Sequence, residues 1–155
     1  MGLDMYLVRR VHIANYPHDQ AGMALANAVL DALGVKNKND YADGSITIEL
    51  PATYWRKANA IHGWFVREVQ KGKDDCSEYY VTREELEQLR ELCRDVLGGE
   101  RPKEDLLPQA GFFFGATDDD AGYCEDLKDT VAQITRVLDA PTVGKFDSFY
   151  YRSSW

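Results

Sequence analysis

A helix signature in the middle of the chain most constrains its fold. Thr82-Arg83-Glu84-Glu85 fits a capping box, in which the Thr82 hydroxyl accepts the backbone N–H of Glu85 and the Glu85 carboxylate accepts that of Thr82. Gly98 and Gly99 are typical of a helix end. Between these signals, apolar residues recur at helical spacing: Leu86, Leu89, Cys93, Val96 and Leu97. We therefore predict a helix that begins after Thr82 and ends at the glycine pair.

Three more segments have helical periodicity. Residues 19–33 place Met23, Ala26, Val29, Leu30 and Leu33 on one face and end at Gly34. Residues 54–71 carry Trp55, Ala58, Ile61, Phe65 and Val69 at steps of three or four. The fourth helix begins at an N-cap, Asp118 or Asp119, and its apolar stripe comprises Tyr123, Leu127, Val131, Ile134 and Leu138.

Strand-like segments lie between these helices. Residues 3–13 and 146–155 are rich in β-branched and aromatic residues, and residues 45–50 alternate until Pro51 ends them. Gly111–Gly115 is a short apolar run between breakers, and the polar residues 35–44 form a loop. The interleaving predicts an α+β fold, a single globular domain over residues 1–155 with about four short strands in a sheet partly covered by about four helices.

Charge is distributed unevenly. The chain has 18 basic and 26 acidic residues; residues 1–75 hold nine of each, and residues 76–155 hold nine basic and seventeen acidic ones. A field of this sign repels phosphate backbones, so we expect no nucleic-acid binding and favour basic partners. The acidic residues also suit a solvated helix surface that keeps the protein soluble. Both interpretations stay open.

Targeting, metal and cofactor signals are missing from the sequence. No apolar run approaches the ~18 residues of a membrane span, and the first residues lack the basic-then-apolar order of a secretion signal, so we expect a cytoplasmic protein with no membrane partner. Cys76, Cys93 and Cys124 have neither redox nor zinc spacing, and the acidic runs miss the calcium-loop pattern. We expect no disulfide framework, no metal site and no cofactor.

The densest group of polar and aromatic residues lies in the predicted helix 54–71: Tyr54, Trp55, Arg56, Asn59 and His62. On a helix, Arg56, Asn59 and His62 fall within an arc of about 120°, so they can share one polar face. His62 is the only member that titrates near neutral pH, which makes it the candidate general acid or base. The alternative is a structural histidine, hydrogen-bonded at the edge of the core.

The residues that end the sequence form a second candidate site. The aromatic segment Tyr150–Trp155 predicts docking onto the body of the protein or onto a partner. We expect the C-terminal strand to lie next to the predicted helix 54–71 and Trp155 to be at least half buried. Arg152 suits either a phosphate or carboxylate ligand or a surface salt bridge. In Gly111–Gly115, three adjacent phenylalanines need cover on both faces, or one of them, with Phe113 the candidate, lies exposed in a groove.

Several blocks of sequence resemble a known family. GLDMYL, YWRKANAIHGWFV, GFFFG followed by EDLK, and YYRSSW are similar to segments of uncharacterised small proteins, many of them encoded by phages, prophages and mobile elements. The similar segments span most of the chain outside residues 14–50. The resemblance implies a phage or prophage setting and no mechanism.

Two functions are compatible with these observations. The first is a non-catalytic binding protein, a phage accessory factor that engages a host protein or sequesters a small ligand. The alternative is a small enzyme that acts on a nucleotide-like or other anionic ligand in a pocket formed by Trp55, Arg56, Asn59, His62 and Arg152. A concave site that gathers these side chains favours the enzyme, whereas a His62 packed among apolar residues favours the binding protein.

Overall fold

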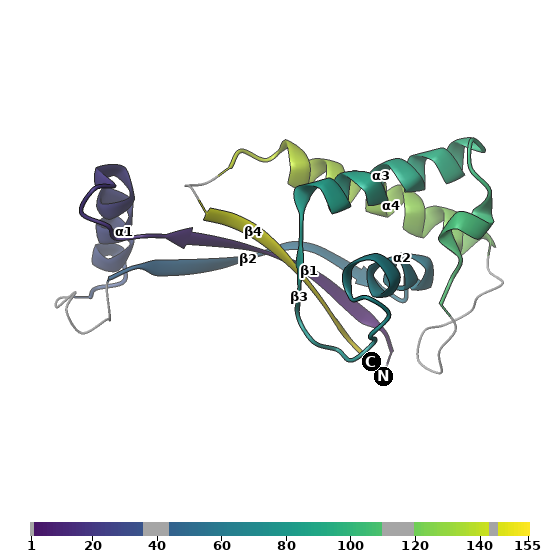
Figure 1. Ribbon diagram of the computed structural model, residues 1–155, viewed down its shortest axis with the longest axis horizontal. Helices are drawn as coiled ribbons and strands as arrows, with labels where there is room; N and C mark the ends of the chain where they lie inside the picture. The colour runs from purple at the N-terminus through teal and green to yellow at the C-terminus, as the bar shows by residue number, and fades with distance from the viewer. Residues whose placement is uncertain (1, 36–43, 110–119, 143–145) are drawn as a thin grey trace. The chain divides into compact units, whose positions relative to one another are not determined.

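The computed structural model describes residues 2–35, 44–109, 120–142 and 146–155. Four strands form one antiparallel sheet: β1 (Asp4–Ile13), β2 (Ile46–Arg56), β3 (Tyr79–Val81) and β4 (Phe146–Ser154). Their order across the sheet is β2-β1-β4-β3, so the strand that comes last along the chain lies between β1 and β3 (Figure 1). The predicted α+β class is confirmed.

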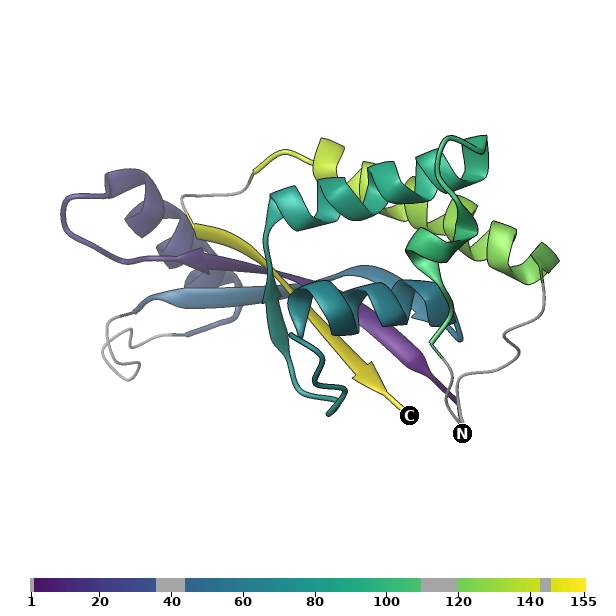
Figure 2. The same ribbon diagram turned by 45° about the vertical axis from the view of Figure 1, so that its right-hand side comes forward.

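The helices are α1 (Gln20–Ala32), α2 (Asn59–Trp64), α3 (Arg83–Gly98) and α4 (Asp120–Asp139). A π-helical turn, η2 (Phe65–Val69), continues α2, and a short 3₁₀ helix, η3 (Lys103–Leu106), follows α3. The antiparallel pair α3 and α4 lies side by side (Figures 1 and 2). Within the described residues, no helix is both long enough and apolar enough to cross a membrane.

Contacts divide the chain into two compact units. The large unit comprises Met1–Val8, Pro51–Pro141 and Phe149–Trp155, and the small unit comprises Arg9–Leu50 and Thr142–Ser148. Strands β1, β2 and β4 therefore each contribute residues to both units. The helices α2, α3 and α4 belong to the large unit, and α1 belongs to the small one.

One face of the strands in the large unit carries its core. Apolar side chains of the strands pack with those of the helices, and the fully buried members include Met5, Leu7, Ile61, Phe65, Leu86, Leu89, Leu127, Ile134, Phe149 and Tyr151. Because side chains alternate along a strand, the residues between Met5 and Leu7 or between Phe149 and Tyr151 point to the opposite face of the sheet. Burial of this kind, at about 25 cal/mol per Å² of apolar surface, is the main stabilising term.

The small unit has a separate apolar cluster. Val11, Ile13 and Ala26 are buried there, with Ile46 and Ile48 packed against them. An ion pair joins Arg9 to Asp147 with both side chains largely buried, and the contact to the carboxylate keeps the pKa of Arg9 above its usual value.

The predicted helix boundaries near Thr82 are confirmed. The Glu85 N–H donates to the Thr82 hydroxyl at 3.0 Å, and the Thr82 N–H donates to the Glu85 carboxylate at 2.8 Å. Gly99 closes α3 with a φ of 76°, a left-handed conformation that favours glycine. Helix α4 buries most of its predicted stripe, and α1 begins where expected, after Asp19. Leu33, predicted for the buried stripe of α1, is instead 72% exposed.

The prediction that Pro51 ends a strand is wrong. Strand β2 continues through Pro51 to Arg56, and because β2 is an edge strand, the missing N–H of a proline need not remove a ladder hydrogen bond. The predicted helix 54–71 is therefore wrong in its first turn. Lys57, with a φ of 58°, turns the chain, and α2 begins only at Asn59.

Other predictions fall on residues outside the described ranges. These are the strand at Gly111–Gly115 with Phe113, the N-cap at Asp118 or Asp119, and most of the loop 35–44. Conversely, the short strand β3 was not predicted, because its three residues are too few to show an alternation.

Candidate functional site

The predicted cluster around Tyr54 divides between the two faces of the sheet. Trp55 is 3% exposed and packs under the helices, whereas its neighbour Tyr54 is 46% exposed on the opposite face. Arg56 is exposed at the end of the same strand, and Asn59 and His62 are buried in α2. The shared polar face predicted for Arg56, Asn59 and His62 is therefore wrong, because Arg56 does not belong to the helix.

Tyrosines line the sheet face that points away from the core. Tyr6 on β1 and Tyr54 on β2 have ring centroids 5.4 Å apart, and Tyr80 on β3 and Tyr150 on β4 have centroids 5.8 Å apart. The last two residues are direct partners in the antiparallel register. The guanidinium of Arg152, also on β4, lies 5.4 Å from the centroid of the Tyr6 ring. We call Tyr6, Tyr54, Tyr80, Tyr150 and Arg152 the tyrosine face; it crosses all four strands within the large unit.

The tyrosine face has its own electrostatics. The Tyr54 hydroxyl donates to Asp4, and this hydrogen bond raises the pKa of Tyr54 above its ordinary value. Arg152 forms its cation–π contact with Tyr6, and neither Arg56 nor Arg152 forms an ion pair with any residue of the described ranges. The face therefore carries the Asp4 carboxylate, which accepts from Tyr54, and two guanidinium groups without a carboxylate partner in the described ranges.

The backbone of β2 at this site is held by a helix. The Gln133 side chain of α4 accepts from the Tyr54 N–H at 3.1 Å and donates to the Tyr54 carbonyl at 3.0 Å. The indole N–H of Trp55 donates to the Thr130 hydroxyl of the same helix at 3.0 Å. An edge strand normally presents unpaired backbone groups to solvent, and these contacts pair two of them and fix the strand that carries Tyr54.

His62 lies on the core side of the sheet, in a hydrogen-bonded network. Its Nδ1 is 2.8 Å from the hydroxyl oxygen of Tyr151, and its Nε2 is 3.1 Å from Oδ2 of Asp74. A carboxylate only accepts, so we infer that Nε2 carries the proton and that Nδ1 accepts from Tyr151. Both ring nitrogens of a neutral histidine are then satisfied.

Burial sets the protonation states in this network. It lowers the pKa of His62 below the ordinary value of 6.5, and the contact with Asp74 opposes this effect only in part. Burial also raises the pKa of Tyr151 well above 10, with the Asp74 charge adding to the rise. Both side chains are fully buried, and Tyr151 stacks on Phe65 with centroids 3.8 Å apart. The network is neutral at His62 and closed to a ligand.

The Asp74 carboxylate accepts hydrogen bonds from three residues in distant parts of the chain. His62 is the first; the Gln109 amide donates to Oδ2 and the Trp155 indole N–H donates to Oδ1, each at 3.1 Å. Trp155 is 42% exposed, which confirms the prediction that it is at least half buried. The hydrogen bond between His62 of α2 and Tyr151 of β4 also confirms the prediction that this helix and the C-terminal strand are neighbours.

Two backbone features allow these contacts. Asp74 lies in the segment between η2 and β3, where Lys71, Gly72 and Cys76 all have φ values between 56° and 82°. Gly63 lets the residues around Gln109 approach α2, since a Cβ there would lie 3.2 Å from the Gln109 Cβ. Left-handed backbone at non-glycine residues is uncommon, so this segment is held in place by its contacts.

Part of the acidic surface lines a groove of about 590 Å³ beside α3. Arg101 lies between Asp95 and Asp105, 3.8 Å from a carboxylate oxygen of each, and Arg94 and Arg90 pair with Glu91. The groove is lined by Trp64, Glu68, Gln88, Glu91, Leu92, Asp95, Arg101 and Asp105. Three of its four carboxylates thus have arginine partners, which favours the interpretation as a solvated helix surface.

Cysteine and metal chemistry have no support in the described ranges. The three cysteines are free thiols, and burial raises the pKa of Cys93 to about 12. No group of three or more histidine, cysteine, aspartate or glutamate residues there is arranged to hold a metal ion.

Comparisons with protein-family models, curated proteins and solved structures find no match for this chain. The resemblance to phage-encoded proteins therefore stays a prediction. No relative lends a role to any residue of the tyrosine face or of the His62 network.

Sequence reasoning included Tyr150 and Tyr151 in the second candidate site but missed four other residues of the two sites: Tyr6, Asp74, Tyr80 and Gln109. Alternation along Phe146–Ser154 was a usable signal, because it places Tyr150 and Arg152 on one face and Tyr151 on the other. Asp74 and Gln109 had no such signal, since neither lies in a helix or strand.

Proposed function

We propose that the protein is a non-catalytic binding protein that holds a partner protein on its tyrosine face. The observation that carries the proposal is the row of Tyr54, Tyr6, Arg152, Tyr150 and Tyr80 across four strands, on the face opposite the core. Tyrosine and arginine are the residue types that most often dominate the energetics of protein interfaces.

Rigidity supports this proposal. A tyrosine side chain has few rotatable bonds, so it gives a large contact area at low entropic cost. The strands beneath the face are fixed by the core. In addition, Gln133 of α4 holds β2, and the hydrogen bond between His62 and Tyr151 holds β4. A preorganised surface loses less conformational entropy when a partner binds.

Charge favours a partner segment that carries carboxylates. Arg56 and Arg152 are exposed and form no ion pair with the described residues, and a guanidinium forms paired hydrogen bonds with a carboxylate. The sequence favoured basic partners from the excess of acidic residues, but the local charge at this face favours the opposite sign. The phage resemblance makes a host protein the natural partner.

The enzyme alternative receives less support. Its pocket required Trp55, Arg56, Asn59, His62 and Arg152 to meet around a ligand, but Trp55, Asn59 and His62 are at most 4% exposed while both arginines are exposed. A ligand would have to open the His62 network to reach its nitrogens. Neither of the two described hollows, beside Trp64 and beside Gly22, is lined by Arg56 or Arg152.

The test is selection of binders from a random peptide library on the full chain. We expect the selected peptides to be rich in Asp and Glu, and their Kd to rise at least about tenfold on Arg152→Gln and on Tyr80→Ala, the loss typical of an interface hot spot.

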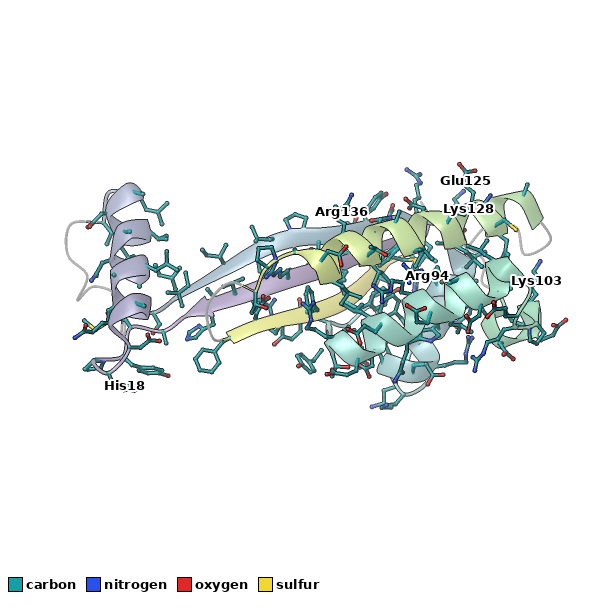
Figure 3. All side chains as sticks on the ribbon, turned by 90° about the horizontal axis from the view of Figure 1, so that it is seen from above. His18, Arg94, Lys103, Glu125, Lys128 and Arg136 are labelled. Atoms are coloured by element: carbon teal, nitrogen blue, oxygen red, sulfur yellow. The ribbon has the colours of Figure 1, made fainter. Side chains whose placement is uncertain are left out.

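Two matched controls keep the test specific. Arg136→Gln removes an exposed arginine from α4, whose side chain projects from that helix in Figure 3, and Tyr16→Ala removes a tyrosine of similar exposure in the small unit. Both should leave the Kd unchanged. Peptides whose binding is equally sensitive to the controls, or turnover of a ligand that His62→Gln abolishes, would contradict the proposal.

A further inference from the structure

The groove beside α3 carries more acid than base. Glu68, Glu91, Asp95 and Asp105 are the acidic residues that line it, and Arg101 is the basic one. Charges of one sign around a concave surface strengthen the local field, which attracts a ligand of the opposite sign. The excess of acidic residues in the sequence favoured basic partners, and in this groove such a partner meets four carboxylates.

An indole N–H without a partner opens into the groove. Trp64 lines the groove and is only 4% exposed, and no described residue accepts a hydrogen bond from its Nε1. This nitrogen is nevertheless not among the buried polar atoms that lack a partner, so it reaches solvent, in the groove that the ring lines. The other two indole N–H groups of the chain both donate, from Trp55 to Thr130 and from Trp155 to Asp74. Because tryptophans this buried usually pair their N–H, the free donor indicates a ligand that brings an acceptor.

Glu68 presents an unpaired carboxylate about one helical turn from Trp64. The two residues are four positions apart where α2 continues into η2, so their side chains project from neighbouring points of one helix surface. Glu68 is exposed, and its carboxylate forms no ion pair or hydrogen bond within the described part of the chain. A hydrogen-bond donor and an anionic acceptor therefore lie side by side. Their complement is a cation next to a carbonyl oxygen.

The groove already holds a guanidinium that belongs to the chain itself. Arg101 lies 3.8 Å from a carboxylate oxygen of Asp95 and 3.8 Å from one of Asp105. Both distances are too long for a hydrogen bond, and all three side chains are at least 36% exposed. Ion pairs of this kind contribute little to stability, so an incoming cation can displace Arg101 easily. The two aspartates are nevertheless placed to hold one guanidinium between them.

We propose that this groove binds a basic segment of a partner protein. One basic side chain of the segment pairs with Glu68, a backbone carbonyl beside it accepts from Trp64, and a second basic side chain replaces Arg101 between Asp95 and Asp105. At roughly 30 Å³ per heavy atom, a groove of about 590 Å³ holds about twenty such atoms, the size of a short peptide segment. A free polyamine has no acceptor for the indole N–H, which favours the peptide. The groove shares no residue with the tyrosine face, so this site does not depend on the proposed function.

An NMR titration of the full chain at low ionic strength tests the proposal, with the acetylated and amidated peptide Gly-Arg-Gly-Arg-Gly as the probe. We expect the indole N–H signal of Trp64 to move as peptide is added, because it gains an acceptor. The signals of Trp55 and Trp155 should stay, since both N–H groups keep their partners within the protein. Glu68→Gln should raise the Kd about tenfold, the loss expected for one hydrogen bond between charged groups.

Matched variants separate the groove from the general charge of the protein. Glu87→Gln removes an exposed glutamate of α3 that does not line the groove and should leave the Kd unchanged. Arg101→Gln should lower the Kd by up to about fivefold, because the peptide no longer competes with this side chain for the aspartates. Arg136→Gln changes the net charge equally, outside the groove, and should have no such effect.

Three results would overturn the proposal. The first is a Trp64 signal that does not move at any peptide concentration. The second is an equal rise of the Kd on Glu68→Gln and Glu87→Gln, which would show attraction to the acidic surface as a whole. The third is spermine that shifts the Trp64 signal as far as the peptide does, because spermine carries no carbonyl to accept from the indole.

Discussion

The Nδ1 atom of His62 lies 2.8 Å from the hydroxyl oxygen of Tyr151, a residue 89 positions further along the chain. The contact joins α2 to β4, one of the two central strands of the sheet, and the other ring nitrogen joins α2 to Asp74. One imidazole therefore connects three segments that have no local reason to meet.

Removal of this imidazole should destabilise the fold. We expect His62→Ala to lower the free energy of unfolding by about 1 to 3 kcal/mol, because it leaves the Tyr151 hydroxyl without its acceptor, and Tyr151→Phe to cost about 1 kcal/mol. Urea denaturation measures both. His18→Ala, at an exposed histidine, is the control and should stay within about 0.5 kcal/mol of wild type. A His62→Ala protein as stable as wild type would make a ligand role for His62 the better interpretation.

Stability should fall as the pH is lowered below about 6.5. Burial lowers the pKa of His62 in the folded state, so below the ordinary value the unfolded chain binds a proton at this residue while the folded chain does not. Between the ordinary pKa and the lowered one, His62 should decrease the free energy of unfolding by at most about 1.4 kcal/mol for each pH unit that the pH falls. Urea midpoints from pH 7.5 to 5.5 measure it. His62→Gln should flatten the profile and His18→Gln should leave it unchanged; identical profiles for all three proteins would refute the assignment.

The Thr82 cap should contribute measurably to α3. Thr82→Ala removes the acceptor of the Glu85 N–H and should cost about 1 kcal/mol, whereas Thr82→Ser keeps the hydroxyl and most of the stability. Thermal unfolding of the two variants distinguishes them. Equal losses would indicate that the methyl group of the threonine, rather than its hydroxyl, is responsible.

Thiol reactivity should distinguish Cys124 from Cys93. Cys124 is exposed and should react with an aromatic disulfide reagent quickly, whereas Cys93 is fully buried with a pKa of about 12 and should react only after unfolding. Cys124→Ser should remove the fast phase of the reaction. A fast phase that instead disappears on Cys93→Ser would show that α3 opens readily.

Local signals predicted the parts of the fold that depend on local chemistry. The capping box at Thr82 and the apolar stripe of α4 correspond to helices because hydrogen bonds and burial within one segment decide them. The segment 54–71 shows where this fails. Trp55, Ala58, Ile61, Phe65 and Val69 are all buried, as predicted, but the first lies in a strand and the last two in a π-helical turn. The spacing therefore predicted which residues are buried, but it did not predict whether each of them lies in a helix or in a strand.

The candidate site was predicted only in part, for a topological reason. Tyr54 and Arg152 were selected as candidates, but the order of strands that brings them to one face was not visible in the sequence. His62 was predicted to be either catalytic or structural, and its partner Asp74 comes from a segment with no periodicity. Contacts between such segments depend on the assembled fold.

The position of β4 between β1 and β3 has a consequence for synthesis on the ribosome. Residues 146–154 are made after every other element of the fold, and until they emerge, β1 and β3 each lack the neighbour that pairs with them. The nascent chain can form α3 and the β1–β2 pair, but its apolar sheet surface stays open at two strand edges, which favours association with other chains. Among the described elements, the sheet can therefore be completed only by insertion of β4 between two strands that precede it in the chain.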